Sequence, residues 1–361
     1  MRKRKRRLCL ALALALCLTG CASGGAAETG TPSGQETGTQ SRQETGAPSG
    51  QETGTAAGEQ DRLGPLTDAG FPQTGAQVIA IPDQDVPLSG EEGGVLLPDA
   101  PGIDIYANSS AVIDYSNAAD GYICVSWTAE SDAKLKVLIG GPGGASYQYN
   151  LRPDGEYDVF PLSDGSGTYN VGVYKNASGT QYATILTGTV DARLNSEFAP
   201  FLRPNQYVYF TADSQAVKTA ASVCTGAAGN LDKVERVYTY VVEALTYDQD
   251  KARTVTSGYL PDVDAALAAG KGICFDYASL MAAMLRSQGV PVKLVVGYTG
   301  EAYHAWLNVW SEADGWVDGK IYFNGREWKL MDPTFASSAS RSDSIMEYIG
   351  DGSNYTAKYL Y

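Results

Sequence analysis

The hydrophobic pattern of this 361-residue chain changes its period near Pro204. From about Gly102 up to that point, short segments alternate apolar and polar residues, as expected for strands with one buried face. Beyond it, apolar residues recur at intervals of three and four, which is typical of amphipathic helices. A chain of this length has room for about two domains. The pattern predicts an α+β protein in which an all-β domain precedes a domain of helices and strands.

The first of these domains is expected over residues 102–193. Alternating segments at this spacing, with turn sequences such as Asp164–Gly167 between them, favour a small immunoglobulin-like antiparallel β-sandwich. Cys124 falls on one strand and is interpreted as a small buried hydrophobic side chain, while a disulfide with Cys224 is left open. The expected strands are Ile103–Tyr106, Tyr122–Trp127, Lys134–Ile139, Tyr169–Tyr174 and Tyr182–Leu186.

Residues 1–20 have the layout of a secretory signal peptide. Six consecutive basic residues, Arg2–Arg7, precede the apolar run Leu8–Leu18, which is about half the length of a membrane-spanning helix. The sequence Leu18–Cys21 resembles the lipobox of bacterial lipoproteins. This resemblance implies lipidation of Cys21 and an extracytoplasmic protein anchored to the bacterial cell membrane by lipid. The alternative is an ordinary signal peptide that ends near a cysteine.

The segment after Cys21 is expected to be a tether. From Glu28 a sequence of eight residues beginning Glu-Thr-Gly repeats, and it contains no large apolar residue that could form a core. We therefore interpret residues 21–61 as a flexible tether and residues 62–101 as an irregular linker.

Composition excludes two kinds of function. His304 is the only histidine, so a metal site with several imidazole ligands is excluded, and no metal or cofactor is expected. With a net charge of −14, the protein lacks the excess of basic residues that is typical of nucleic-acid-binding proteins. Without the six basic residues of the signal peptide, 21 basic and 41 acidic residues remain, a net charge of −20. Lipid rather than charge would then hold the protein at a membrane.

The helical part contains a cysteine in an unusual place. Helices are expected over Ser214–Ala221, Leu231–Leu245 and Pro261–Ala269, with Pro261 in its first turn. A fourth helix should open at Cys274, after Gly270 and Gly272, and run to about Gln288. The partial positive charge of a helix N-terminus favours a thiolate, and its free N–H groups can hold an oxyanion. The alternative is a structural cysteine on a buried helical face.

Two more reactive side chains follow on predicted strands. Tyr303–Trp310 alternates, so His304 lies on the face opposite the small aliphatic residues. Trp328–Thr334 is expected to be a strand that ends at Pro333, with Asp332 placed to accept an imidazole N–H. Alone, each is an ordinary core or turn residue. Together with Cys274 they form the nucleophile, base and orienting group that covalent acyl transfer needs.

These stretches resemble the transglutaminase-like superfamily. The matching sequences are GKGICFDYASLMAAMLRSQGVPVKLVVGY, YHAWLNVW and WKLMDPTF, with residues 240–248 similar to the helix that precedes the core. The resemblance spans about 205–361 and implies a papain-like core, with helices packed on an antiparallel sheet. It also implies that Cys274 is the nucleophile, His304 the base and Asp332 the orienting residue.

The sequence departs from the family in two respects. Eukaryotic members use an upstream tryptophan as an oxyanion donor, and no tryptophan lies between Trp127 and Trp306, so Tyr247 is the candidate substitute. The segment between His304 and Asp332 is long, and Asp314-Gly315 and Asn324-Gly325 predict hairpin turns there.

Two functions remain open at this point. The first is a surface cysteine enzyme that hydrolyses or transamidates peptide or glutamine amides through a thioester, with a protein or a cell-wall peptide as substrate. The second is a non-catalytic surface module that binds wall peptides or partner proteins, because fold alone does not establish function.

Overall fold

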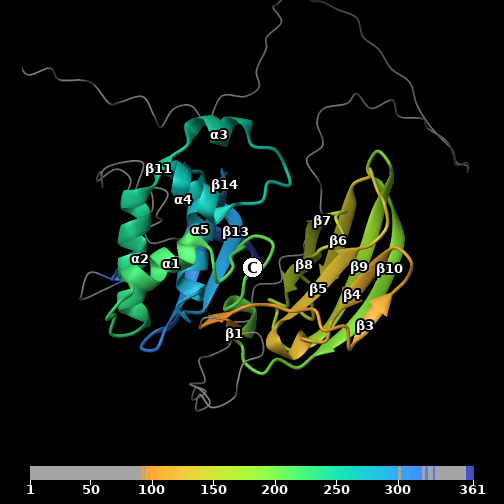
Figure 1. The fold of residues 1–361 in the computed structure, drawn as a ribbon, viewed down its shortest axis with the longest axis horizontal. Coiled ribbons are helices and arrows are strands. Elements are labelled where there is room, and N and C mark those ends of the chain that lie inside the picture. Colours follow the sequence, from red (N-terminus) through yellow and green to blue (C-terminus); the bar gives the residue numbers. More distant parts are fainter. Residues whose placement is uncertain (1–90, 93, 300–301, 319–321, 324–327, 330–354) are drawn as a thin grey trace, which may run out of the picture. The chain divides into compact units, whose positions relative to one another are not determined.

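Two four-stranded antiparallel sheets make up the first part of the structure. The computed structural model describes residues 91–92, 94–299, 302–318, 322–323, 328–329 and 355–361. The sheets have the orders β3-β4-β5-β8 and β10-β9-β6-β7 (Figure 1). Their strands are β3 (Ile105–Ala107), β4 (Ala111–Asp114), β5 (Tyr122–Trp127), β6 (Leu135–Gly140), β7 (Ser146–Leu151), β8 (Tyr157–Pro161), β9 (Gly167–Ser178) and β10 (Gln181–Ala192).

The two sheets pack against each other, which confirms the all-β region. Tyr149 of β7 contacts Phe160 of β8 across the layers, with ring centroids 4.6 Å apart. The five expected strands are present within a few residues of their predicted bounds, apart from β9 and β10, which are longer. Strands β4, β7 and β8 were not predicted. The immunoglobulin-like part of the interpretation stays a prediction.

Strand β5 is buried along its whole length instead of on one face. The preceding segment covers its outer side, where Tyr122 donates to the Asp99 carboxylate at 3.0 Å and the Cys124 thiol donates to the Asp99 carbonyl at 3.4 Å. Cys124 is therefore a buried side chain, as predicted. The structure leaves Cys124 and Cys224 as separate free thiols rather than a disulfide.

Helices dominate the second part. The four expected helices are confirmed, with bounds that shift by up to two residues at either end. Pro261 precedes the N-cap Asp262 and does not belong to the first turn of its helix. A fifth helix, α3, was not predicted. The helices are α1 (Gln215–Val223), α2 (Asn230–Ala244), α3 (Gln249–Thr254), α4 (Val263–Ala269) and α5 (Cys274–Arg286).

A four-stranded antiparallel sheet of order β15-β14-β13-β18 accompanies these helices. Gly315, with φ of +76°, lies where the β14–β15 hairpin reverses, so the first predicted turn is confirmed; Asn324 lies outside the described residues. The strands are β13 (Val292–Thr299), β14 (Ala302–Ser311), β15 (Gly315–Val317) and β18 (Tyr355–Leu360). Three two-stranded pairs are β1 (Glu91–Glu92) with β2 (Val95–Leu96), β11 (Thr246–Tyr247) with β12 (Lys271–Gly272), and β16 (Tyr322–Phe323) with β17 (Trp328–Lys329).

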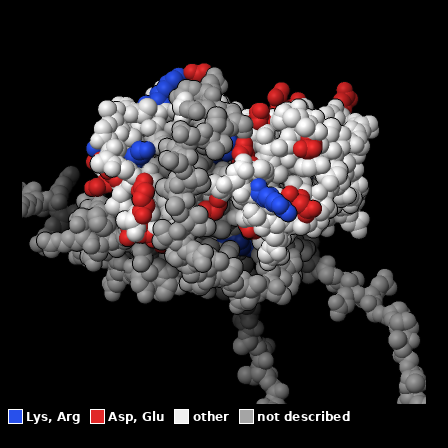
Figure 2. Space-filling view, turned by 90° about the horizontal axis from the view of Figure 1, so that it is seen from below, with Lys and Arg blue, Asp and Glu red and all other residues white. Residues whose placement is uncertain are grey.

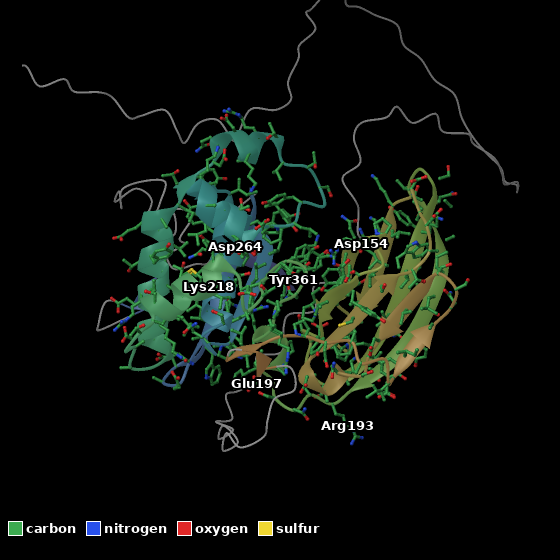
Figure 3. The ribbon with its side chains drawn as sticks, in the orientation of Figure 1. Asp154, Arg193, Glu197, Lys218, Asp264 and Tyr361 are labelled. Carbon is green, nitrogen blue, oxygen red and sulfur yellow. The ribbon has the colours of Figure 1, made fainter. Side chains whose placement is uncertain are left out.

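Helix α5 is the centre of this second part. It packs against α1, α2 and α4 and against strands β13 and β14. Every residue from Asp276 to Arg286 is buried, because neighbours surround the helix on all sides. The start of α1 is fixed by Asp264 of α4, whose carboxylate accepts the N–H groups of Gln215 and Ala216 at 3.0 and 2.9 Å (Figure 3 labels Asp264).

Aromatic side chains connect the two parts, and all described residues fall within one unit, 65–361. Tyr207 contacts Tyr149 of β7, Tyr361 and Phe275 of α5, with ring centroids 5.7, 4.6 and 5.4 Å away. The Gln206 amide also donates to the Asn150 carbonyl at 2.7 Å. The linker after the sandwich thus bonds to both the sandwich and the helix that begins at Cys274.

The surface carries more acidic than basic side chains, in line with the composition. Figure 2 shows acidic residues scattered over one face among uncharged ones, with fewer basic residues between them. None of the helices in the described ranges is both long and apolar enough to cross a bilayer.

Candidate functional site

Cys274 is the first residue of α5, as the sequence predicts. The N-cap of the helix is Ile273. The Cys274 side chain is partly exposed, whereas the helix is buried from Asp276 onward. A thiol in this position lies beside unpaired backbone N–H groups and the positive end of the helix dipole. The position therefore suits a nucleophile better than a buried structural cysteine.

The start of α5 is held by Asp276. This fully buried carboxylate accepts the Ile273 N–H at 2.8 Å, which is one half of a capping box; isoleucine has no side-chain acceptor for the other half. Gly272 makes room for it, because a Cβ at Gly272 would lie 2.6 Å from the Asp276 Cβ. Asp276 therefore fixes the chain on both sides of Cys274.

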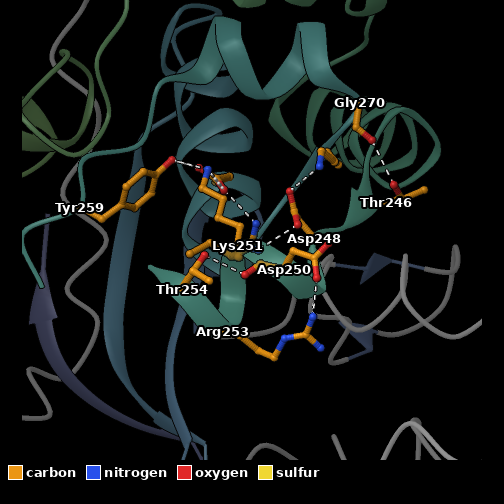
Figure 4. A network of polar contacts seen from close by, with 11 residues as sticks. Thr246, Asp248, Asp250, Lys251, Arg253, Thr254, Tyr259 and Gly270 are labelled. Carbon is orange, nitrogen blue, oxygen red and sulfur yellow. Dashed lines mark hydrogen bonds and ion pairs between the residues drawn. The ribbon is translucent and has the colours of Figure 1, made fainter. Parts of the chain in front are cut away.

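Two donors from outside α5 complete the shell of Asp276. Lys251 of α3 donates to its carboxylate at 2.7 Å, and the Tyr259 hydroxyl donates to the other oxygen (Figure 4 labels both donors). The Lys251 ammonium also lies 4.4 Å from the centroid of the Tyr259 ring. Burial, followed by the bond to Asp276, raises the pKa of Tyr259 well above its ordinary value, so Tyr259 remains a donor.

Sequence reasoning assigned no role to Asp276, Lys251 or Tyr259. The available signal was an acidic residue at the third position of a predicted helix, where carboxylates bond the free N–H groups. Its partners lie 25 and 17 residues away, so only the tertiary structure identifies them.

Helix α3 begins at a second carboxylate, Asp248. It accepts the backbone N–H of Lys251 at 3.0 Å and pairs with the Lys271 ammonium at 3.0 Å. These contacts, that N–H first, hold the pKa of Asp248 below its ordinary range. Asp248 thus orients the short helix that delivers Lys251 to Asp276 (Figure 4).

Tyr247, the predicted oxyanion donor, lies close to Cys274 along the backbone ladder. Strands β11 and β12 pair in parallel, with Tyr247 opposite Gly272. The Thr246 N–H donates to the Gly270 carbonyl and the Asp248 N–H to the Gly272 carbonyl, each at 2.9 Å. This register places Tyr247 beside Gly272, which is two residues before Cys274 in the sequence. The role of the Tyr247 hydroxyl stays a prediction.

His304 lies on β14, as predicted, and is 7% exposed. On the neighbouring strand β13, Gly297 lies opposite His304. A Cβ at Gly297 would lie 2.9 Å from the Trp306 ring and 2.1 Å from a backbone oxygen of β18, so only glycine leaves this space for the indole. The centroid of the His304 ring lies 6.3 Å from that of Trp306 and 6.2 Å from that of Tyr355. Aromatic side chains therefore restrict the orientation of the imidazole.

Chain geometry brings the His304 end of β14 level with the start of α5. Arg286, at the end of α5, donates to the carbonyl of Val292, which begins β13, at 2.7 Å. From that junction α5 extends back about 18 Å to Cys274. Strand β13 returns about 17 Å to Gly297, opposite His304. Because α5 packs against β13 and β14, these similar lengths favour a location of Cys274 and His304 at the same end of the helix-and-sheet unit.

A local interaction supports this placement. Desolvation, then the charges of Tyr359, Tyr298 and Cys274, raise the pKa of Tyr303 to about 12. The residue before His304 is therefore within electrostatic range of the thiol. Asp332 lies outside the described residues. The catalytic triad stays a prediction.

Over the described ranges, no three His, Cys, Asp or Glu side chains come together as metal ligands. A cysteine at a helix start with an imidazole and a hydroxyl nearby is suited to form and resolve an acyl–enzyme.

Comparison with known proteins gives one curated relative and several solved structures. The uncharacterized protein YebA of Bacillus subtilis (strain 168) is 30% identical over 199 residues, covering 49% of this chain. The matched part spans 25% of YebA, about a quarter of its length.

The solved structures are distant in sequence. A candidate cysteine protease from Cytophaga hutchinsonii shares 17% identity, with 59% of this chain and 71% of that chain covered and a TM-score of 0.30. Red sea bream transglutaminase shares 11% identity, with 59% and 48% covered and a TM-score of 0.25.

The family comparison is specific to the helical part. Residues 217–319 match the transglutaminase-like superfamily, and this range includes most of α1, all of α2 to α5 and strands β11 to β15. It also contains Cys274, His304 and Tyr247. The chain therefore carries a transglutaminase-like domain at residues 217–319.

Proposed function

We propose that this protein is a surface lipoprotein whose transglutaminase-like domain is a cysteine enzyme acting on amide bonds. The observation that carries the proposal is the position of Cys274 at the start of α5, a helix that packs against β14, the strand on which His304 lies. The family match at residues 217–319 supports the same reading of the site.

The reaction would proceed in two steps. The Cys274 thiol gives its proton to His304, and its sulfur attacks the amide carbonyl to form a tetrahedral oxyanion. Free N–H groups at the start of α5 and the Tyr247 hydroxyl would stabilise that charge. His304 then protonates the departing amine, which leaves a thioester on Cys274. In this proposal Asp332 orients the imidazole.

Water or a primary amine would resolve the thioester. Attack by water releases an acid and regenerates the thiol, and attack by an amine forms a new amide. Hydrolysis is the favoured outcome, because water needs no acceptor site. Residues 1–20 would direct export, Cys21 would carry the lipid, and the tether would bring cell-wall peptides or surface proteins within reach.

The test is the reactivity of Cys274 in the full chain. We expect iodoacetamide to label Cys274 at about pH 6 much faster than an unstructured thiol, because the proposed base His304 would accept the proton of the thiol as its sulfur reacts. Cys124 and Cys224 serve as internal references, since burial raises the pKa of both thiols. His304→Gln should remove the advantage.

Two further outcomes divide the functions. If Cys274 reacts like a free thiol and His304→Gln changes nothing, the enzyme is rejected and a non-catalytic binding module remains. If labelling is fast, a glutamine peptide and a primary-amine probe separate the reactions. A stable amine adduct would reject a pure hydrolase.

A further inference from the structure

A shallow groove of about 630 Å³ crosses the β10-β9-β6-β7 sheet of the sandwich. It is lined from strands β3, β6, β7, β9 and β10 and includes no residue of the transglutaminase-like domain. The groove thus lies apart from Cys274, and the proposed reaction assigns no role to it.

Glycines allow two tyrosine rings to lie against the sheet and shape the groove. A Cβ at Gly172 would lie 2.6 Å from the ring of Tyr174, so that ring rests directly on the glycine. A Cβ at Gly188 would lie 2.2 Å from the ring of Tyr106. Any other residue at either position would displace a ring that lines the groove.

The two rings have different roles. Tyr106 is fixed on several sides: its ring stacks on Tyr115 with centroids 5.0 Å apart, and its hydroxyl donates to the Thr189 carbonyl at 2.7 Å. Tyr174 is half-buried, with one side on Gly172 and part of its surface in the groove. Tyr106 is a wall, whereas Tyr174 offers a flat apolar surface to a ligand.

Uncharged polar groups line the rest of the groove. Asn170 is opposite Thr189 and Gly172 is opposite Thr187 on the paired strands β9 and β10. The Thr189 hydroxyl donates to the Asn170 side-chain oxygen at 3.2 Å, which leaves the Asn170 amide group oriented by its neighbour. With Ser146, these side chains supply both hydrogen-bond donors and acceptors.

The chemistry of the lining selects the ligand. Among the described residues that line the groove none carries a charge, so it offers no cation to a phosphate or an acidic peptide. A sugar ring matches it, because its C–H face packs on an aromatic ring and its hydroxyls pair with amides and hydroxyls. We propose that this groove binds a neutral glycan, with Tyr174 as the stacking residue.

The experiment measures binding of two neutral probes, the tetrasaccharides of N-acetylglucosamine and of glucose, to the full chain by calorimetry. We expect at least one to bind, and Tyr174→Ala to weaken it about tenfold or more through loss of the stacking surface. Thr187→Val, which keeps the side-chain shape, should weaken binding severalfold. Tyr209→Ala is the matched control, because Tyr209 is an exposed tyrosine outside the groove.

The contrary results are equally defined. If neither probe binds, or if Tyr174→Ala and Tyr209→Ala bind alike while both retain the wild-type circular dichroism spectrum, the proposal is overturned. Tighter binding of an anionic oligosaccharide would overturn the neutral class. Cys274→Ala should bind the probe as the wild type does; loss of binding there would move the glycan to the thiol site. Labelling of Cys274 is independent of all these outcomes, so either proposal can fail alone.

Discussion

The sandwich and the transglutaminase-like domain use buried charge in different ways. In the sandwich, Asp114 is nearly fully buried and accepts the Gly102 and Ser116 N–H groups at 2.7 and 2.9 Å, 12 and 2 residues away. Asp158 accepts from Arg152, six residues away. These carboxylates hold the loops beside their own strands.

In the transglutaminase-like domain, buried charged side chains bond to residues that are far away in the sequence. Asp276 binds Lys251 across 25 residues, and Arg286 binds the carbonyls of Arg203 and Tyr361 across 83 and 75 residues. One group is near each end of α5. The buried carboxylates Asp114 and Asp158 thus hold loops that are near in the sequence, whereas the helix that carries the thiol is positioned from distant parts of the chain.

Removal of Arg286 should have the largest effect on this contrast. Arg286→Leu takes a charged donor from the carbonyls of Val292, Arg203 and Tyr361, and we expect a loss of about 3 kcal/mol in the free energy of unfolding. Arg236→Leu is the control, because it breaks a half-exposed ion pair with Asp232 and should cost under about 1 kcal/mol. Urea denaturation measures both, and equal losses would contradict the role given to Arg286.

The ion pair at the start of α5 can be removed separately. Lys251→Met leaves the buried Asp276 carboxylate without its cation, and we expect a loss of about 2 kcal/mol together with slower labelling of Cys274. Arg253→Met on the same helix breaks an exposed pair with Asp250 and should change neither quantity. A Lys251→Met protein that labels at the wild-type rate would show that the pair supports only the fold.

A substitution in the sandwich tests whether the close approach of Tyr106 to Gly188 affects the stability of the protein without affecting Cys274. Gly188→Ala places a Cβ 2.2 Å from the Tyr106 ring, and we expect a loss of about 2 kcal/mol. Gly140→Ala, whose Cβ meets nothing nearer than 3.9 Å, should stay within about 0.5 kcal/mol. Neither should alter Cys274 labelling. Thermal unfolding decides, and equal midpoints would contradict the close approach at Gly188.

The smallest expected effect depends on pH. Asp248→Asn keeps an acceptor for the Lys251 N–H but loses the charge that Lys271 pairs with. Because the folded pKa of Asp248 is depressed, the carboxylate stabilises the protein above the ordinary Asp pKa of about 3.9. That contribution disappears as pH falls through the lower folded value. Urea midpoints should favour the wild type at about pH 6 and converge at about pH 2; a constant difference would exclude this charge as the cause.

The sequence predicted the parts of the fold where periodicity is strong. Strand β5 has the predicted bounds, and α5 begins at the predicted residue, because apolar spacing and flanking glycines signal both. Helix α3 was not predicted because Gln249–Thr254 is polar apart from Ala252 and therefore has no apolar stripe. Its only local signal is the N-cap Asp248. Strand β4 is only four residues long, too short for alternation to be distinctive.

The sequence indicated the candidate reactive residues but not the side chains that hold them in place. Cys274 was predicted at a helix start and His304 on an alternating strand, and the structure confirms these two local placements. Their catalytic roles stay predictions. Asp276 needed the knowledge that Lys251 and Tyr259 approach it, which no local pattern contains. The groove of the sandwich likewise depends on which glycine faces which ring.

The short ladder between β11 and β12 has a consequence for how such a domain can vary. It joins Tyr247 to Gly272, so the excursion through α3 and α4 leaves and returns at one place in the structure. The entropic cost of closing a loop grows only slowly with the number of residues in it, so added residues change the free energy of folding little. Lys251 and Tyr259 of this excursion bind Asp276, and α4 packs on α1 and α5. The exposed parts of the excursion outside these contacts can be lengthened or replaced while Tyr247 stays paired with Gly272.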